Sequence, residues 1–163
     1  MGSGFSSPPF DHPRPPFDHP KEECGVVGVY TPEEEASRLA FFGLFALQHR
    51  GQESAGIAAT NGDGVKVHAD MGLVTQIFRE RNFYPLAGDM AIGHTRYSTT
   101  GSSEICNAQP LLVEGHLGQL ALAHNGNIIN SPQLKEQLLN EWNCTFNSTT
   151  DTEVIALMLA NAS

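Results

Sequence analysis

Cys24 opens the apolar segment CGVVGVY, and it has the residue type and the position of a nucleophile. If residues 1–23 were removed, its thiol and a free α-amino group would belong to one residue, and a base would stand beside the nucleophile. That amine has a reference pKa of about 7.7–8.0, so near neutral pH it can accept and return a proton. While the bond to Glu23 persists, the nitrogen is an amide, and we predict that the leader keeps this thiol inactive. Taken alone, a cysteine at the start of a buried strand is more often a small core residue.

Four further residues could complete a site around such a thiol. Asn125 and Gly126 follow a predicted strand, where a side-chain amide and a backbone N–H can form an oxyanion hole; a simple Asn-Gly turn is the plain alternative. Arg96 ends an apolar strand and could grip a carboxylate, although a surface salt bridge would also explain it. Asp151 lies in the first turn of a predicted helix, where the helix dipole favours a carboxylate and where it could receive an ammonium group. Together these groups describe a pocket for glutamine, whose side-chain carbonyl can be attacked.

The composition describes an ordinary globular protein and argues against several partners. A length of 163 residues fits one domain. Hydrophobic residues make up 40% and charged residues 17%, which is usual for a globular protein. The net charge of −9 argues against a nucleic-acid partner. No apolar run approaches the roughly 20 residues of a membrane span, and no signal peptide opens the sequence, so we expect no membrane partner and a cytoplasmic location. The three cysteines indicate neither a disulfide framework nor a metal site, and we interpret Cys106 and Cys144 as small buried hydrophobes.

Residues 8–14 and 15–21 form a tandem repeat, PPFDHPR followed by PPFDHPK. Proline prevents regular hydrogen bonding, so this segment should be extended and exposed. Metal binding by its histidines is an alternative, but a solvated leader fits a low-complexity tail better. We therefore expect a leader over residues 1–23 and a folded domain over residues 24–163. The last predicted helix ends without a glycine cap or a polar tail, which favours a fragment of a longer protein.

Hydrophobic patterning and capping signals predict both helices and strands. Thr31 and Pro32 have the residue types that open a helix, and its apolar pattern continues to about Gln48. Asn61-Gly-Asp-Gly is typical of a hairpin loop. Thr150-Asp-Thr-Glu has the pattern of a capping box and opens the last helix. The predicted strands are residues 24–30, 54–60, 65–70, 89–97 and 119–125, and the predicted helices are residues 32–48, 131–142 and 150–163.

The same segments carry a resemblance to a known family. The matching residues are CGVVGVY at 24–30, ALQHRGQESAGIA at 46–58, GHTRYSTTG at 93–101, NAQP at 107–110, LAHNGNI at 122–128 and TDTEVI at 150–155. Over this span the chain resembles the class II glutamine amidotransferases. The related glucosamine-fructose-6-phosphate aminotransferases tend to carry tyrosine, tryptophan and histidine where this chain has His49, Tyr97 and Gln109. At all three positions the chain sides with the branch of the family that serves purine synthesis.

The resemblance implies an α+β fold, the four-layer αββα sandwich of the N-terminal nucleophile hydrolases, incomplete here at its C-terminal end. It implies that Cys24 attacks glutamine, that Asn125 and Gly126 hold the oxyanion, and that Arg96 and Asp151 bind the α-carboxylate and the α-ammonium group. Arg50 would support the pocket edge or pack near Glu53, outside catalysis.

In complete family members the released ammonia reaches a phosphoribosyltransferase domain and makes 5-phosphoribosylamine, the first step of purine synthesis. That domain is absent from residues 24–163. The resemblance implies no cofactor in this chain; Mg²⁺ and, in leader-bearing members, an iron–sulfur cluster belong to the C-terminal part. It also implies a homo-oligomer at full length.

The sequence also leaves two other hypotheses for the function open. A catalytically silent fragment or regulatory module would bind glutamine without releasing glutamate. A redox or metal protein would use the cysteines and the leader histidines, but their spacing matches no known ligand set.

Overall fold

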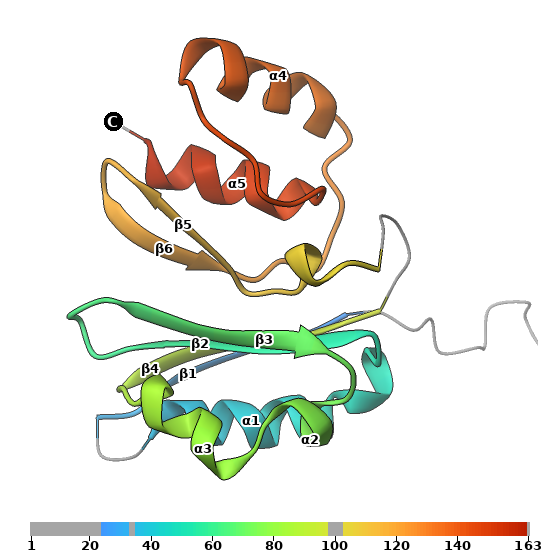
Figure 1. Cartoon of the computed structure of the whole chain (residues 1–163), viewed down its shortest axis with the longest axis vertical. Coiled ribbons are helices and arrows are strands. Elements are labelled where there is room, and N and C mark those ends of the chain that lie inside the picture. Colours follow the sequence, from blue (N-terminus) through green and yellow to red (C-terminus); the bar gives the residue numbers. More distant parts are fainter. Residues whose placement is uncertain (1–23, 33–34, 98–102, 163) are drawn as a thin grey trace, which may run out of the picture.

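Two antiparallel sheets lie face to face, with helices on both outer sides (Figure 1). The computed structural model describes residues 24–32, 35–97 and 103–162. Within them, the first sheet has the strand order β1-β4-β2-β3 and the second pairs β5 with β6. The layer order of helix, sheet, sheet and helix confirms the predicted αββα sandwich. The strands are β1 Gly25–Tyr30, β2 Ser54–Thr60, β3 Val65–Met71, β4 Met90–Arg96, β5 Leu111–Gly115 and β6 Gly118–Leu122, and the helices are α1 Ala36–Ala46, α2 Val74–Ile77, α3 Glu80–Phe83, α4 Ser131–Glu141 and α5 Asp151–Ala160.

The first helical layer forms because α1 has small and branched residues at helical spacing. Ala36, Ala40 and Leu44 are fully buried on one face of the helix, against the first sheet. Gly93 on β4 leaves room for Leu44, since a Cβ there would lie 2.8 Å from the leucine Cδ1. Burying one such leucine side chain contributes about 1.5–3 kcal/mol. This layer fixes the strands whose ends carry Cys24 and Arg96.

The second helical layer covers the hairpin of β5 and β6. Its core contains Val113 from β5, Leu138 from α4, and Val154 and Leu157 from α5, all buried. In Figure 1, α5 lies directly on this hairpin and α4 lies farther out. Packing on the hairpin fixes the N-terminal end of α5, where Asp151 stands.

The two sheets approach closely where the segment before β5 crosses β2. Gly56 on β2 allows this approach, because a Cβ there would lie 2.4 Å from the carbonyl oxygen of Gln109. Gln109 is itself buried. The crossing segment, residues 107–110, is called the strap below.

Most predicted elements are confirmed, but some boundaries and caps are wrong. The helix predicted from Pro32 begins at Ala36, and the backbone N–H of Thr31 instead donates to the carbonyl of Asp89. The helix predicted from residue 150 does begin at Asp151, yet no capping box forms there. The Glu153 carboxylate instead accepts hydrogen bonds from the backbone of residues 147 and 148, at 2.8 and 2.7 Å. Strand β5 and the short helices α2 and α3 were not predicted.

Two burial predictions also need correction. The first strand was predicted to be buried, but Val26 and Tyr30 on β1 are 43% and 71% exposed. β1 lies at the edge of its sheet, and the second sheet of the described residues has only two strands to cover it. Cys106 is exposed rather than buried, whereas Cys144 is partly buried and packs on the second core.

Some predictions lie outside the described residues, namely the leader over residues 1–23, part of the segment after Thr31, and residues 98–101 of the GHTRYSTTG segment. No helix among the described residues is long and apolar enough to cross a membrane.

Candidate active site

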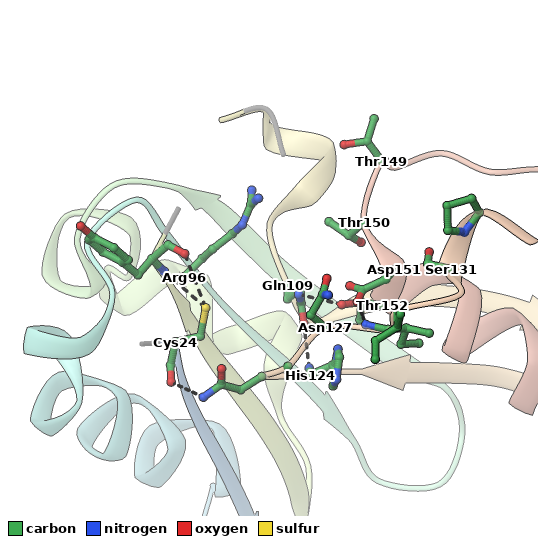
Figure 2. A pocket seen from close by; sticks show the side chains of 16 residues that line it. Cys24, Arg96, Gln109, His124, Asn127, Ser131, Thr149, Thr150, Asp151 and Thr152 are labelled. Atoms are coloured by element: carbon green, nitrogen blue, oxygen red, sulfur yellow. Dashed lines mark hydrogen bonds between the residues drawn. The ribbon is translucent and has the colours of Figure 1, made fainter. Parts of the chain in front are cut away.

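One cavity of about 650 Å³ is lined by all five residues that the sequence singled out: Cys24, Arg96, Asn125, Gly126 and Asp151. They come from distant parts of the chain, and the sandwich brings them together. Figure 2 shows Cys24 and Arg96 on one side of the cavity, Asp151 on the other, and Gln109 and His124 between them. The remaining lining residues are Tyr97, Gln109, His124, Asn127, Ile128, Ile129, Ser131, Pro132, Thr149, Thr150 and Thr152.

The thiol and the carbonyl group of Cys24 are both held in place. The backbone N–H of Tyr97 donates to Sγ at 3.4 Å, and Sγ lies 3.7 Å from the Tyr97 carbonyl oxygen. The Cys24 carbonyl oxygen accepts from Asn125 Nδ2 at 2.7 Å and from Arg50 Nε at 3.5 Å. Arg50 is not among the residues that line the cavity, but it contacts the backbone of Cys24 and supports the cysteine in this way.

Arg96 is fixed in the cavity wall by an ion pair with Glu53. Its Nη1 lies 3.1 Å from Glu53 Oε1, and both side chains are largely buried, at 6% and 11% exposure. Arg96 thus forms the salt bridge that was its alternative explanation, but the pair is buried instead of lying on the surface. Gly51 makes this arrangement possible, because a Cβ there would lie 2.7–2.8 Å from the backbone of Thr95 and Arg96. The segment before β2 thus packs directly on the end of β4.

The loop after β6 carries the predicted oxyanion donors. The NH₂ group of Asn125 has two N–H bonds, and the Cys24 carbonyl engages this group. Gly126 packs closely on the ring of His124, since a Cβ on this glycine would lie 2.6 Å from the ring Nε2. Asn125 and Gly126 are both exposed and line the cavity, and the pair is anchored by the hydrogen bond of Asn125 to the Cys24 carbonyl.

Asp151 begins α5 and is tied to the same loop. Its Oδ2 accepts the backbone N–H of Ile128 at 2.6 Å. A carboxylate in the first turn of a helix is stabilised by the helix dipole. Asp151 therefore faces the cavity in a defined position.

Sequence reasoning assigned no role to three buried polar residues near the cavity, Asn107, Gln109 and Thr152. Asn107 and Gln109 belong to the NAQP segment, which carried the resemblance without suggesting a contact. The signal available was their type, because buried amides are nearly always hydrogen-bonded. Their partners could not be found from spacing, since the partner residues lie 15–43 positions away.

His94 is a buried histidine on β4 beside this network. Its side chain is fully buried, and among the described residues neither ring nitrogen has a hydrogen-bond partner. Burial lowers the pKa of His94 to about 4, and the charges of Arg96 and His124 act in the same direction. A contact with the backbone of His124 acts in the opposite direction without reversing the shift. The ring is therefore neutral at pH 7.

We predict an acid-sensitive contribution of His94 to folding. Because its folded pKa of about 4 lies below the unfolded value of 6.5, the unfolded chain binds more protons between these pH values. The contribution of His94 to the free energy of unfolding should be fully present above pH 6.5, and up to about 3 kcal/mol of it should be lost as the pH drops towards 4. Urea unfolding from pH 7 to pH 4 measures this slope, and His94→Asn should flatten it.

The same substitution at the exposed His116 controls for the loss of an imidazole as such. Equal slopes in the parent protein and His94→Asn would contradict the prediction.

The αββα sandwich and the cavity at the start of its first strand define the fold class of the N-terminal nucleophile amidotransferases. The sequence comparison gives the family. A family model described as "Glutamine amidotransferase domain" matches residues 80–162, and the chain belongs to this family.

Curated relatives and solved structures agree with this assignment. The chain is 56% identical over 142 residues to an amidophosphoribosyltransferase of Synechococcus elongatus, covering 87% of this chain and 29% of the relative. It is 51% identical over 138 residues to the enzyme of that name from Archaeoglobus fulgidus, covering 84% and 30%. A glutamine phosphoribosylpyrophosphate amidotransferase structure from B. subtilis, complexed with ADP and GMP, matches with a TM-score of 0.70 at 45% identity, covering 80% of this chain and 28% of that one. A structure described as the allosteric regulatory enzyme of purine biosynthesis matches with a TM-score of 0.72 at 46% identity, with the same coverage.

The chain thus spans less than a third of the length of these relatives.

Proposed function

We propose that this chain is a glutaminase, in which Cys24 hydrolyses glutamine to glutamate and ammonia. One observation supports the proposal best: five residues chosen from the sequence for complementary roles line one cavity. The cavity is surrounded by a thiol, an amide donor, a cation and an anion. These match, in turn, the side-chain carbonyl carbon of glutamine, its carbonyl oxygen, its α-carboxylate and its α-ammonium group. The family to which the chain belongs is described by the same substrate.

In the proposed complex, Arg96 and Asp151 hold the two charged α-groups of the substrate. The guanidinium carries five N–H donors in a planar fork, and the ion pair of Nη1 with Glu53 fixes its orientation. The Asp151 carboxylate would receive the α-ammonium group. With the α-carboxylate and the α-ammonium group both held, the side-chain amide is directed towards Cys24 and the loop after β6. Correct orientation of the reacting groups is a large part of catalysis.

The reaction is an acyl transfer that begins at Cys24. The α-amino group of Cys24 takes the thiol proton, Sγ bonds to the amide carbon of the substrate, and the carbonyl electron pair moves onto oxygen. The second N–H of the Asn125 amide and the backbone N–H of Gly126 would stabilise this oxyanion. The C–N bond then breaks, the α-ammonium group of Cys24 gives its proton to the leaving nitrogen, and ammonia departs. A γ-glutamyl thioester remains.

Water completes the cycle. The α-amino group of Cys24 takes a proton from water, the resulting hydroxide attacks the thioester carbon, and the C–S bond breaks. The thiolate regains its proton from the α-ammonium group, and glutamate leaves. Every proton transfer uses the amine of Cys24, so the mechanism requires a chain that begins at this residue.

For the whole protein we propose the activity that the relatives' names describe. Ammonia would pass to a phosphoribosyltransferase domain and form 5-phosphoribosylamine at the start of purine synthesis, in a cytoplasmic homo-oligomer. Within the described residues, no group of three or more His, Cys, Asp or Glu side chains could hold a metal ion. No step above uses Mg²⁺ or an iron–sulfur cluster.

The proposal is tested by the intact mass of the purified protein together with glutamate release from glutamine. Protein whose mass corresponds to a chain starting at Cys24 should release glutamate. Protein that keeps residues 1–23 should be slower by about 10²-fold or more, because it lacks the general base. An engineered protease site before Cys24 supplies the trimmed form if the leader stays attached.

Trimmed, folded protein that binds glutamine and releases no glutamate would overturn the catalytic proposal. It would instead establish the silent glutamine-binding module.

A further inference from the structure

Gln109 joins the two halves of the cavity through a buried side chain that is only 5% exposed. Its Oε1 accepts the backbone N–H of His124 at 2.8 Å, and its Nε2 donates to Thr152 Oγ1 at 3.0 Å. His124 immediately precedes Asn125, and Thr152 immediately follows Asp151. One amide group therefore links the backbone of the oxyanion loop to the first turn of α5, and Figure 2 shows it between them.

The strap that carries Gln109 is itself anchored on both sides. On one side, the Gln109 backbone lies directly on β2, because Gly56 has no side chain to keep it away. Two residues earlier, Asn107 grips the segment before α5: its Nδ2 donates to Thr149 Oγ1 at 2.9 Å, and its Oδ1 accepts the Thr149 N–H at 3.0 Å. The strap thus ties the start of α5 to the first sheet, on which Cys24 and Arg96 stand.

Glutamine makes this link consequential. Its α-ammonium group and its side-chain carbonyl are joined by a few rotatable bonds, so their separation has an upper limit. The distance at which a site holds the two partners therefore decides whether one glutamine conformer can engage both. Asp151 and the Asn125–Gly126 loop belong to different elements, and a misplacement of about 1 Å between them would cost about 10²-fold in rate.

We propose that Gln109 is a positioning residue that sets the distance between the α-amino site and the oxyanion donors, acting on the α5 side through the Thr152 hydroxyl. The inference rests on the proposed glutaminase function and deepens it. Gln109 touches no reacting atom in this scheme; it acts through the backbone of His124 and the first turn of α5.

Variants of Thr152 test the link in the full natural polypeptide. Thr152→Val keeps the size of the side chain and removes the hydroxyl that Gln109 engages, whereas Thr152→Ser keeps the hydroxyl. We expect Thr152→Val to raise the KM for glutamine about tenfold, with a smaller change in kcat, and Thr152→Ser to restore the KM. Thr145→Val, at an exposed position away from the cavity, is the matched control for the substitution itself.

Gln109→Leu removes both hydrogen bonds and should lower kcat/KM about 10²-fold. Because Gln109 acts on α5 through its hydrogen bond to Thr152, and Gln109→Leu already removes this bond, the double variant with Thr152→Val should be no worse than Gln109→Leu alone. If the losses of kcat/KM in Gln109→Leu and Thr152→Val multiply in the double variant, the inference is overturned. It is also overturned if Thr152→Val and Thr152→Ser have the same KM for glutamine. If Thr152→Val lowers the melting temperature and leaves the KM for glutamine unchanged, the inference is overturned as well, since the contact between Gln109 and Thr152 would then serve only stability.

Glutamine binding to the Cys24→Ala background separates this inference from the proposed function. Calorimetry should show an affinity about tenfold weaker in Cys24→Ala/Thr152→Val than in Cys24→Ala, and recovery with serine at position 152. If the parent protein releases no glutamate but this pattern holds, the glutaminase proposal fails and the positioning role of Gln109 stands. If the parent hydrolyses glutamine and the affinities do not differ, only the positioning role fails.

Discussion

Cys24→Ala is expected to abolish glutamate release, with kcat at least about 10⁴-fold lower than that of the parent, because the substitution removes the attacking sulfur and leaves only the binding groups. The contacts of Arg96 and Asp151 do not depend on Sγ, so glutamine should still bind. The measurement is glutamate release under single-turnover conditions, with calorimetric titration of glutamine into the variant. A protein that binds glutamine without turning it over is the expected result.

Cys106→Ser is the matched control. Cys106 is an exposed cysteine that does not line the cavity. Desolvation, followed by the hydrogen bond and the charge of Glu104, raises the pKa of its thiol. Glutamate release should be unchanged in this variant. If Cys24→Ala kept a tenth or more of the parent rate, the nucleophile would have to be another group, and the mechanism with the amine of Cys24 would be wrong.

The candidate site could be predicted from the sequence because its residues occupy positions with a local signature. Cys24 and Arg96 stand where apolar strands begin or end, and Asp151 stands in the first turn of a helix with a clear start. Such boundaries follow from short-range patterns. The meeting of these positions in one cavity then depended only on the fold, and the resemblance supplied the fold.

The supporting contacts could not be predicted, since each depends on a distant partner. For Arg96 the sequence left a bound carboxylate and a surface salt bridge open, but it did not indicate that the partner would be Glu53, 43 residues away and buried with it. Glu153 fitted a capping box by spacing, yet its carboxylate turns to the backbone of Ser148, because the chain before α5 folds back over it. At such positions the sequence pattern allows more than one hydrogen-bond partner for a side chain, and the tertiary contacts determine which partner is used.

The errors in burial have the same origin. The apolar run after Cys24 indicated a strand but not how many neighbours would cover it. In the described residues β1 is an edge strand, and Tyr30 on it is 71% exposed. Cys106 follows an apolar residue and was expected inside, but it lies on a short turn before the strap and is exposed. Hydrophobic type alone does not fix the side of the chain that meets the core.

Asn125→Ala should lower kcat by about 10²–10³-fold and change the KM for glutamine much less. In the structure the Asn125 amide is anchored on the Cys24 carbonyl at 2.7 Å, which leaves its second N–H available for the oxyanion of the proposed mechanism. A donor aimed at charge that develops only in the transition state stabilises that state more than the bound substrate. The comparison of kcat with KM in steady-state assays measures this difference.

Asn140→Ala, on the exposed face of α4 and away from the cavity, is the matched control and should behave like the parent. Since Asn125 also holds the Cys24 carbonyl, its loss could act by displacing the nucleophile instead of by exposing the oxyanion. Alkylation of Cys24 by iodoacetamide separates these effects, because that reaction forms no oxyanion. An unchanged alkylation rate with a lowered kcat supports the oxyanion role, whereas equal losses in both would mean that Asn125 serves only to place the cysteine.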